Sequence, residues 1–211
     1  MLSKKMNRDL KIYKDNNARL SGIMQSVNSG DFRPALYEIS KEMSDLANKI
    51  KNNKGKNTKN IVLRNFLFAS IPYVELAAEH QKDFVQIWAF CARNLFEIHL
   101  WSRYVQIDAN NLKKWCVEAQ KDKDDIINFI KRLTDSCGFE AEDRLLEQEK
   151  THIQLLMKQH TIEMPKSYMH ISDIAKELGK KDEYDIFFKI YSKFTHPTSF
   201  LINSLPEEKI Q

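Results

Sequence analysis

The fold is decided by residues 83–107, which read DFVQIWAFCARNLFEIHLWSRYVQI. At about 100° per residue, apolar side chains occupy almost every side of the helix that this stretch would form. A helix that is apolar all round belongs in the interior of a bundle. The sequence therefore predicts a central buried helix here. Its polar exceptions fall within roughly 40° of one another, and they are Gln86, Arg93, Glu97 and Tyr104.

The remaining chain also has the pattern of helices. Five Gly and five Pro in 211 residues provide too few turns for a β-sandwich or barrel. Apolar positions recur at helical spacing, so we predict the all-α class and a helical bundle. Helices are expected over residues 3–27, 34–51, 61–80, 140–160 and 182–196, with one or two more between 111 and 136 and a short one over 173–178 that Ser172 caps and Gly179 ends.

The predicted organisation has three parts in one globular domain. Amphipathic helices fill residues 1–51, a basic loop follows over 52–60, and 61–211 form the core of the bundle. The loop reads NNKGKNTKN and has no acidic residue. Such a loop either contacts phosphate or is an ordinary solvated linker. Its candidate phosphate ligands are Lys54, Lys56 and Lys59.

Charge is distributed unevenly along the chain. The net charge is +4, yet residues 1–64 hold 14 Lys/Arg against 6 Asp/Glu, whereas residues 65–211 hold 19 against 23. This segregation favours a nucleic-acid contact through the N-terminal part. The charged start and the lack of an apolar run of about 18 residues predict a soluble, cytoplasmic protein with no membrane segment.

Several classes of chemistry have no signature in the sequence. The chain contains no Gly-rich phosphate loop, H-E-x-x-H or G-x-S-x-G. The three cysteines, Cys91, Cys116 and Cys137, are too far apart in sequence for a zinc motif and are expected to be buried thiols. We therefore expect neither a metal nor a cofactor.

The last predicted helix carries a polar line. Within DEYDIFFKIYSKFTHPTSF (182–200), spacings of 4, 3 and 4 place four polar residues on one face, opposite an aromatic face. A histidine, a cation and a hydroxyl are the groups that acid/base chemistry on a phosphodiester needs. An ordinary solvated face has the same composition. The polar line is Asp185, Lys189, Ser192 and His196, and the aromatic face is Tyr184, Phe187, Tyr191 and Phe194.

Arg93 is the second candidate. Glu97 follows one turn later and is the natural partner of its guanidinium. The two form either an internal ion pair that joins helices or one wall of a cleft in which Arg93 binds an anion. His99 lies on the same helix but points about 120° away from Arg93, which favours a packing role.

Two segments resemble a bacterial family of all-helical proteins without assigned function. The family pattern is A-R-x-L-x-E followed by Y-x-x-x-Y-R-x-x-S-x-x-x-H-P-S, and this chain has ARNLFE (92–97) and EYDIFFKIYSKFTHPTS (183–199). Phe188 and Lys189 replace the Tyr-Arg of the pattern. The matching residues are Arg93, Glu97, Tyr184, Ser192, His196 and Pro197.

An arginine and a histidine with four to six residues between them also resemble the signature of the HEPN helical superfamily. Many of its members are metal-independent endoribonucleases of toxin–antitoxin and phage-defence systems, and they act as dimers with a shared cleft. Arg93 to His99 fits this spacing, and Lys189 to His196 fits with Lys in place of Arg. The resemblance implies an RNA substrate, a homodimer and an antitoxin or other protein partner.

These observations support two main hypotheses. In the first, a metal-independent endoribonuclease uses His196 as acid/base and Arg93 and Lys189 as phosphate ligands. The alternative is a non-catalytic interaction module with a structural Arg–Glu–His network, and nucleic-acid binding by the basic N-terminal part is a third option. The candidate catalytic residues are Arg93, Glu97, Lys189, Ser192 and His196, and the candidate substrate-binding residues are Lys54, Lys56, Lys59, Asn94, His99 and Tyr184.

Overall fold

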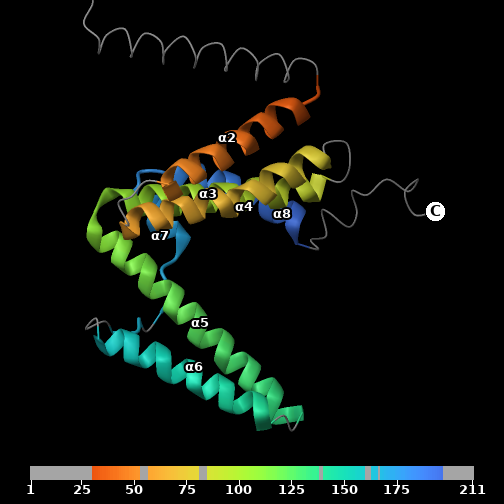
Figure 1. Cartoon of the computed structure of the whole chain (residues 1–211). Coiled ribbons are helices and arrows are strands. Elements are labelled where there is room, and N and C mark those ends of the chain that lie inside the picture. Colours follow the sequence, from red (N-terminus) through yellow and green to blue (C-terminus); the bar gives the residue numbers. More distant parts are fainter. Residues whose placement is uncertain are drawn as a thin grey trace, which may run out of the picture. The chain divides into compact units, whose positions relative to one another are not determined.

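The structure is a computed structural model of the 211-residue chain, and it describes residues 30–52, 57–80, 85–137, 140–159, 163–165 and 167–196. Seven α-helices cover 88% of these residues and no strand occurs among them (Figure 1). The predicted all-α class is thus confirmed. The helices are α2 (Arg33–Asn52), α3 (Thr58–Glu79), α4 (Val85–Ile107), α5 (Ala109–Cys137), α6 (Glu140–Gln159), α7 (Ile171–Glu177) and α8 (Lys181–Thr195).

The basic loop is shorter than predicted. Asn57 is the N-cap of α3, and its side chain accepts a hydrogen bond from the backbone N–H of Lys59 at 2.9 Å. This cap satisfies an otherwise unpaired amide of the first turn. Lys59 therefore lies in a helix and not in a loop. Lys54 and Lys56, like the helix expected over 3–27, lie outside the described residues.

The short helix α7 also differs at its start. Its N-cap is His170, not Ser172, and no side chain caps it. Its end is as predicted: Gly179 has φ +67°, a left-handed conformation that glycine adopts without strain. The N–H of Lys180 donates to the Ala175 carbonyl at 2.7 Å, which is the bond of a Schellman motif.

The chain divides into two compact units. Of the described residues, 30–99 and 182–196 form the first unit, and 100–181 form the second. The boundary falls inside α4, between His99 and Leu100.

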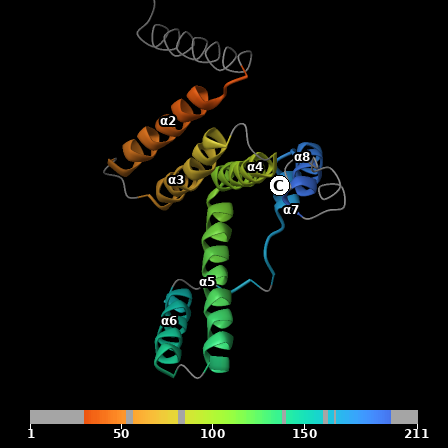
Figure 2. The ribbon, with the colours of Figure 1, turned by 90° about the vertical axis from the view of Figure 1, so that its right-hand side faces the viewer.

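In the first unit α2 packs along α3 (Figure 2). The Ser40 hydroxyl on α2 donates to the Glu75 carboxylate on α3 at 2.6 Å. Small buried residues such as Ala47 and Ala78 allow the two helices to approach closely. Aromatic pairs then join α3 to α4, through Tyr73 and Phe90, and α4 to α8, through Phe96 and Phe187.

One helix of the described chain, α3, is long and apolar enough to cross a membrane by length and composition, with a mean hydropathy of 1.4 over its most apolar window. The expectation that no stretch reaches this length is therefore wrong. The core helices of soluble proteins pass the same criterion, and α3 packs against α2 and buries Phe66 and Val74. Its apolar character alone does not assign a membrane location.

The helix expected at the centre of the bundle is α4, and its burial is partial. It contributes Cys91, Leu100 and Tyr104 to the buried residues. Phe90, however, which was expected in the interior, has 44% of its surface exposed. A position of α4 at the centre of a bundle is thus not confirmed.

In the second unit α5 and α6 lie side by side (Figures 1 and 2). Their core is Ile127, Ile153 and Met157, against which Val117, Leu146 and Met164 pack. The tract that was expected to form one or two helices is the single helix α5.

The core between α5 and α6 gives a matched pair of substitutions. Ile153 is 1% exposed and Leu155, on the same helix, is 52% exposed. Ile153→Ala should lower the free energy of unfolding by about 2–4 kcal/mol, because it leaves a cavity, whereas Leu155→Ala should change it by less than about 1 kcal/mol. Urea unfolding followed by circular dichroism measures both. Equal losses of unfolding free energy in the two variants would contradict the burial of Ile153 between α5 and α6.

Candidate functional site

Helices α4 and α8 bring together two residues that are 103 positions apart. Arg93 lies in α4, and His196 directly follows the last residue of α8. The distance between Arg93 Nη1 and His196 Nε2 is 3.3 Å. A guanidinium nitrogen can only donate, so Nε2 accepts this bond and the imidazole that makes it is neutral. The contact is exposed and therefore accessible to a ligand.

Glu97 orients the guanidinium from one turn further along α4. Arg93 Nε donates to Glu97 Oε1 at 3.2 Å, as the i, i+4 spacing predicted. The two side chains are 25% and 29% exposed, so the ion pair is partly open to water. It is not the fully desolvated pair that the structural hypothesis requires.

The ring of Phe188 supports the other side of the guanidinium. Arg93 Cζ lies 4.5 Å from the centre of this ring, at the distance of a cation–π contact. Phe188 in turn stacks on Tyr184, with ring centres 5.0 Å apart. Arg93 is thus held by a carboxylate, a ring and an imidazole. Sequence reasoning did not assign this role to Phe188, although Phe188 stands at the tyrosine position of the Tyr-Arg pair in the family pattern.

Tyr184, which stacks on Phe188, is only 7% exposed. Burial raises the pKa of its hydroxyl above the ordinary value, the charge of Glu97 raises it further, and the charge of Arg93 opposes this. The hydroxyl is therefore protonated at neutral pH. Its burial makes Tyr184 a support for Phe188 and not the substrate contact that the sequence suggested.

The face of α8 that meets α4 is only partly the predicted one. Phe187, on the predicted aromatic face, packs on Phe96 of α4 although 39% of its surface is exposed, and Tyr184 on the same face is buried. Phe188, which was not placed on that face, also contacts α4 through Arg93. It lies with Tyr184 and Ser192 on one i, i+4 row that leads to His196. A helical wheel does not show that the neighbouring helix covers this row as well.

Ser192 carries a buried hydroxyl that has no hydrogen-bond partner among the described residues. It lies one turn after Phe188 and one turn before His196, next to the two contacts of Arg93. A buried hydroxyl without a partner costs about 1–3 kcal/mol. Such groups in native structures call for an explanation, and one explanation is a ligand that the hydroxyl binds.

The other candidates lie around this cluster or away from it. Lys189 is exposed and has no ion pair within the described part of the chain. The Asn94 amide donates to the Phe90 carbonyl of its own helix at 2.8 Å. His99 is exposed, and the unbroken helix α4 points it about 120° away from Arg93. Lys59 lies in the first turn of α3, whereas the contacts described above join α4 and α8.

The described residues give little support for a metal site or for a reactive cysteine. Among them no group of three or more His, Cys, Asp or Glu side chains could hold a metal ion. Cys91 and Cys116 are free thiols, and burial raises the pKa of both. A raised pKa lowers the thiolate fraction at neutral pH, so neither is an activated nucleophile.

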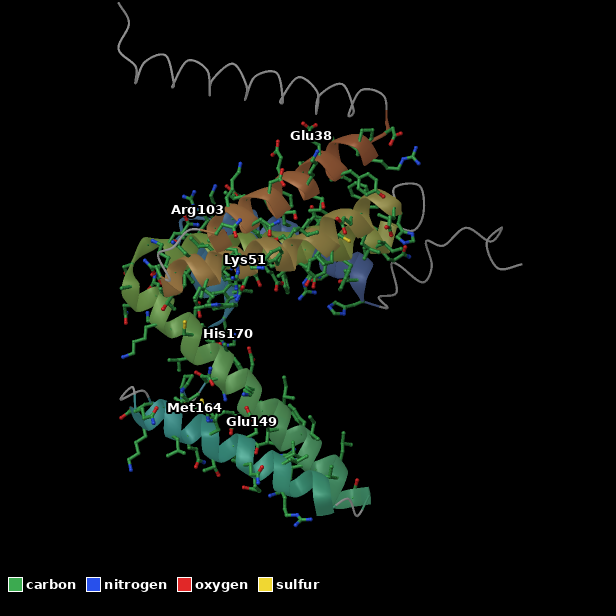
Figure 3. All side chains as sticks on the ribbon, viewed as in Figure 1. Glu38, Lys51, Arg103, Glu149, Met164 and His170 are labelled. Carbon is green, nitrogen blue, oxygen red and sulfur yellow. The ribbon has the colours of Figure 1, made fainter. Side chains whose placement is uncertain are left out.

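The exposure of the ion pair gives a stability prediction. Glu97→Gln should lower the free energy of unfolding by less than about 1 kcal/mol, because water reaches both charges. Glu38→Gln, at an exposed position of α2 (labelled in Figure 3), is the matched control and should have no measurable effect. A loss of about 3–5 kcal/mol for Glu97→Gln in thermal or urea unfolding would instead indicate a buried structural pair.

The comparisons with known proteins add one finding. The model of a family of unknown function (DUF5677) matches residues 80–209. No curated protein and no solved structure matches the chain. The matched range covers more than half of the chain and includes Arg93, Glu97, Ser192 and His196. The chain therefore belongs to the family of unknown function DUF5677.

Proposed function

We propose that Arg93 and His196 form the centre of a metal-independent endoribonuclease site of the HEPN-like kind. The observation that carries the proposal is the 3.3 Å contact between an exposed imidazole and a guanidinium that Glu97 and Phe188 orient. The two catalytic groups that phosphodiester cleavage needs are a proton carrier and a cation. Both are present here on one accessible side of α4 and α8.

The reaction that suits these groups is attack by the ribose 2′-hydroxyl. His196 accepts the 2′-hydroxyl proton, the 2′-oxygen forms a bond to phosphorus, and the bond from phosphorus to the 5′-oxygen breaks. The leaving 5′-oxygen takes up a proton from water, and His196 then returns its proton to the solvent, which gives a 2′,3′-cyclic phosphate, a 5′-hydroxyl and the neutral imidazole again. His196 performs the first step when Arg93 Nη1 turns from the imidazole to the phosphate, because the lone pair at Nε2 that accepted the Arg93 hydrogen bond is then open to the 2′-hydroxyl. DNA lacks the 2′-hydroxyl and is not a substrate.

Arg93 stabilises the negative charge that develops on the phosphate oxygens. Its Nε is occupied by Glu97, whereas Nη2 has no partner among the residues that the structure describes. The fork formed by Nη1 and Nη2 suits two phosphate oxygens. Lys189 adds a second positive charge, and the Ser192 hydroxyl donates to an oxygen of the phosphate or to a bound water. Glu97 and Phe188 position Arg93.

The biological context in this proposal rests on resemblance alone. The HEPN-like spacing suggests a cytoplasmic toxin of a toxin–antitoxin or phage-defence system, a homodimer and a protein partner that controls it. The proposed substrate is RNA, and the proposed reaction needs no cofactor.

The direct test is cleavage of total RNA by the purified full chain in EDTA. We expect fragments with cyclic phosphate ends, and a fall in rate of at least about 100-fold for His196→Ala and Arg93→Ala, the size of effect that removal of an acid/base group produces. His99→Ala is the matched control, because His99 is an exposed histidine that points away from Arg93, and it should retain activity.

Two results would contradict the proposal. Cleavage that survives His196→Ala would show that the activity belongs to another site or to a contaminant. Intact RNA after incubation with the wild-type protein, folded by circular dichroism, would exclude cleavage by this chain alone.

The second candidate is a non-catalytic interaction module. It is favoured by the way in which Arg93, Glu97 and His196 already satisfy one another, and by exposed apolar side chains on α8, Ile186, Phe187 and Ile190. Exposed apolar clusters of this kind are typical of contact surfaces. Intact RNA together with a large loss of stability in His196→Ala would favour this candidate.

A further inference from the structure

The second unit contains a groove with a volume of about 450 Å³. One wall is the N-terminal part of α5, whose lining residues recur at helical spacing. The other wall is formed by residues 163–165 and 167–169, which lie outside the helices. Its volume lies in the range of about 300–1,000 Å³ that is typical of small-molecule sites. The lining residues are Asn110, Lys113, Lys114, Val117, Glu118, Glu163, Pro165, Ser167 and Met169.

Contacts outside the groove hold its two walls in place. The Tyr168 hydroxyl donates to Asp125 Oδ2 at 2.6 Å, and Lys121 lies 4.7 Å from the centre of the Tyr168 ring. At the other end, Met164 packs against the core of α5 and α6. Figure 3 labels Met164 and His170 near the two ends of this segment. The groove is therefore preformed and does not depend on a ligand to shape it.

The α5 wall carries two cations. Lys113 is exposed and has no ion pair within the described chain. Lys114 Nζ donates to the hydroxyl of the buried Tyr104 at 3.3 Å. This hydrogen bond raises the pKa of Lys114, so its charge persists across the neutral range. The pair therefore provides one ammonium oriented by Tyr104 and one exposed ammonium at the same wall.

The acidic residues of the groove limit the charge of a ligand. Glu118 is buried, and its carboxylate accepts the backbone N–H of Met169 at 2.9 Å, so it is already engaged. Glu163 is exposed on the opposite wall, where it repels a second negative charge. Val117, Pro165 and Met169 supply an apolar surface between these polar groups.

We propose that this groove binds a small organic molecule that carries one carboxylate or phosphate group on an apolar body. Lys113 and Lys114 hold the anionic group, and Val117, Pro165 and Met169 contact the apolar body. All of these residues belong to the second unit, whereas the proposed RNA-cleaving residues belong to the first. The inference therefore stands independently of the proposed ribonuclease activity.

The test is calorimetric titration of the full chain with phenyl phosphate and with benzoate. Both probes join an anionic group to an apolar ring, and their two affinities distinguish a phosphate site from a carboxylate site. Benzyl alcohol has the ring without the charge. Its affinity should be at least 10-fold lower than that of phenyl phosphate or benzoate, whichever binds more tightly. Absence of binding by both anions at millimolar concentration overturns the proposal.

Variants locate the binding. We expect two variants to lower the affinity for the more tightly bound anion by at least 10-fold each. They are the double variant Lys113→Gln/Lys114→Gln and the groove-filling variant Ser167→Trp. Lys176→Gln removes the same charge at an exposed position of α7 and should leave the affinity unchanged. If Ser167→Trp fails to fold, the lysine variants decide, because both lysines are exposed. Equal affinity in the wild type and the double variant overturns the proposal.

Discussion

The contacts of one guanidinium organise the part of the first unit where α4 and α8 meet. Arg93 reaches Glu97 on its own helix and both Phe188 and His196 of the other segment. These contacts require one register between the helices, because a shift of α8 by one residue turns each of its side chains by about 100°. The interaction therefore fixes the register of α8, and it also gives the imidazole its hydrogen bond. The packing of α8 on α4 and the candidate chemistry therefore both depend on Arg93 and its contacts.

The partial exposure of these groups bears on what they do. In a buried structural network both charges of the ion pair would be shielded from water. Arg93 and Glu97 instead remain about a quarter exposed, and the contact with His196 is open. An anion could thus reach the guanidinium without displacing the core of the unit. The hydroxyl of Ser192 adds a further group whose hydrogen-bonding capacity no residue within the described ranges uses.

Much of the helical structure could be predicted from periodicity, and the pairing of Arg93 with Glu97 follows from their i, i+4 spacing. The proximity of Arg93 to His196 was expected from the two motifs, and the structure has it. The role of Phe188 could not be foreseen, because spacing within one helix does not reveal which row meets a neighbour. The groove of the second unit had no sequence signal either, since the residues of one of its walls lie outside the helices and follow no regular pattern. The cap of α3 at Asn57 was overlooked because the surrounding lysines suggested a loop.

The division of the chain has a consequence for its synthesis. The first unit is built from two separate segments, and the whole second unit is translated between them. After Arg93 has been added, the ribosome must add 103 more residues before the imidazole of His196 exists. At about 5–20 residues per second this interval is roughly 5–20 s. During that time the nascent chain carries the guanidinium and its carboxylate without the histidine, so the contact between Arg93 and His196 is absent from every shorter nascent chain.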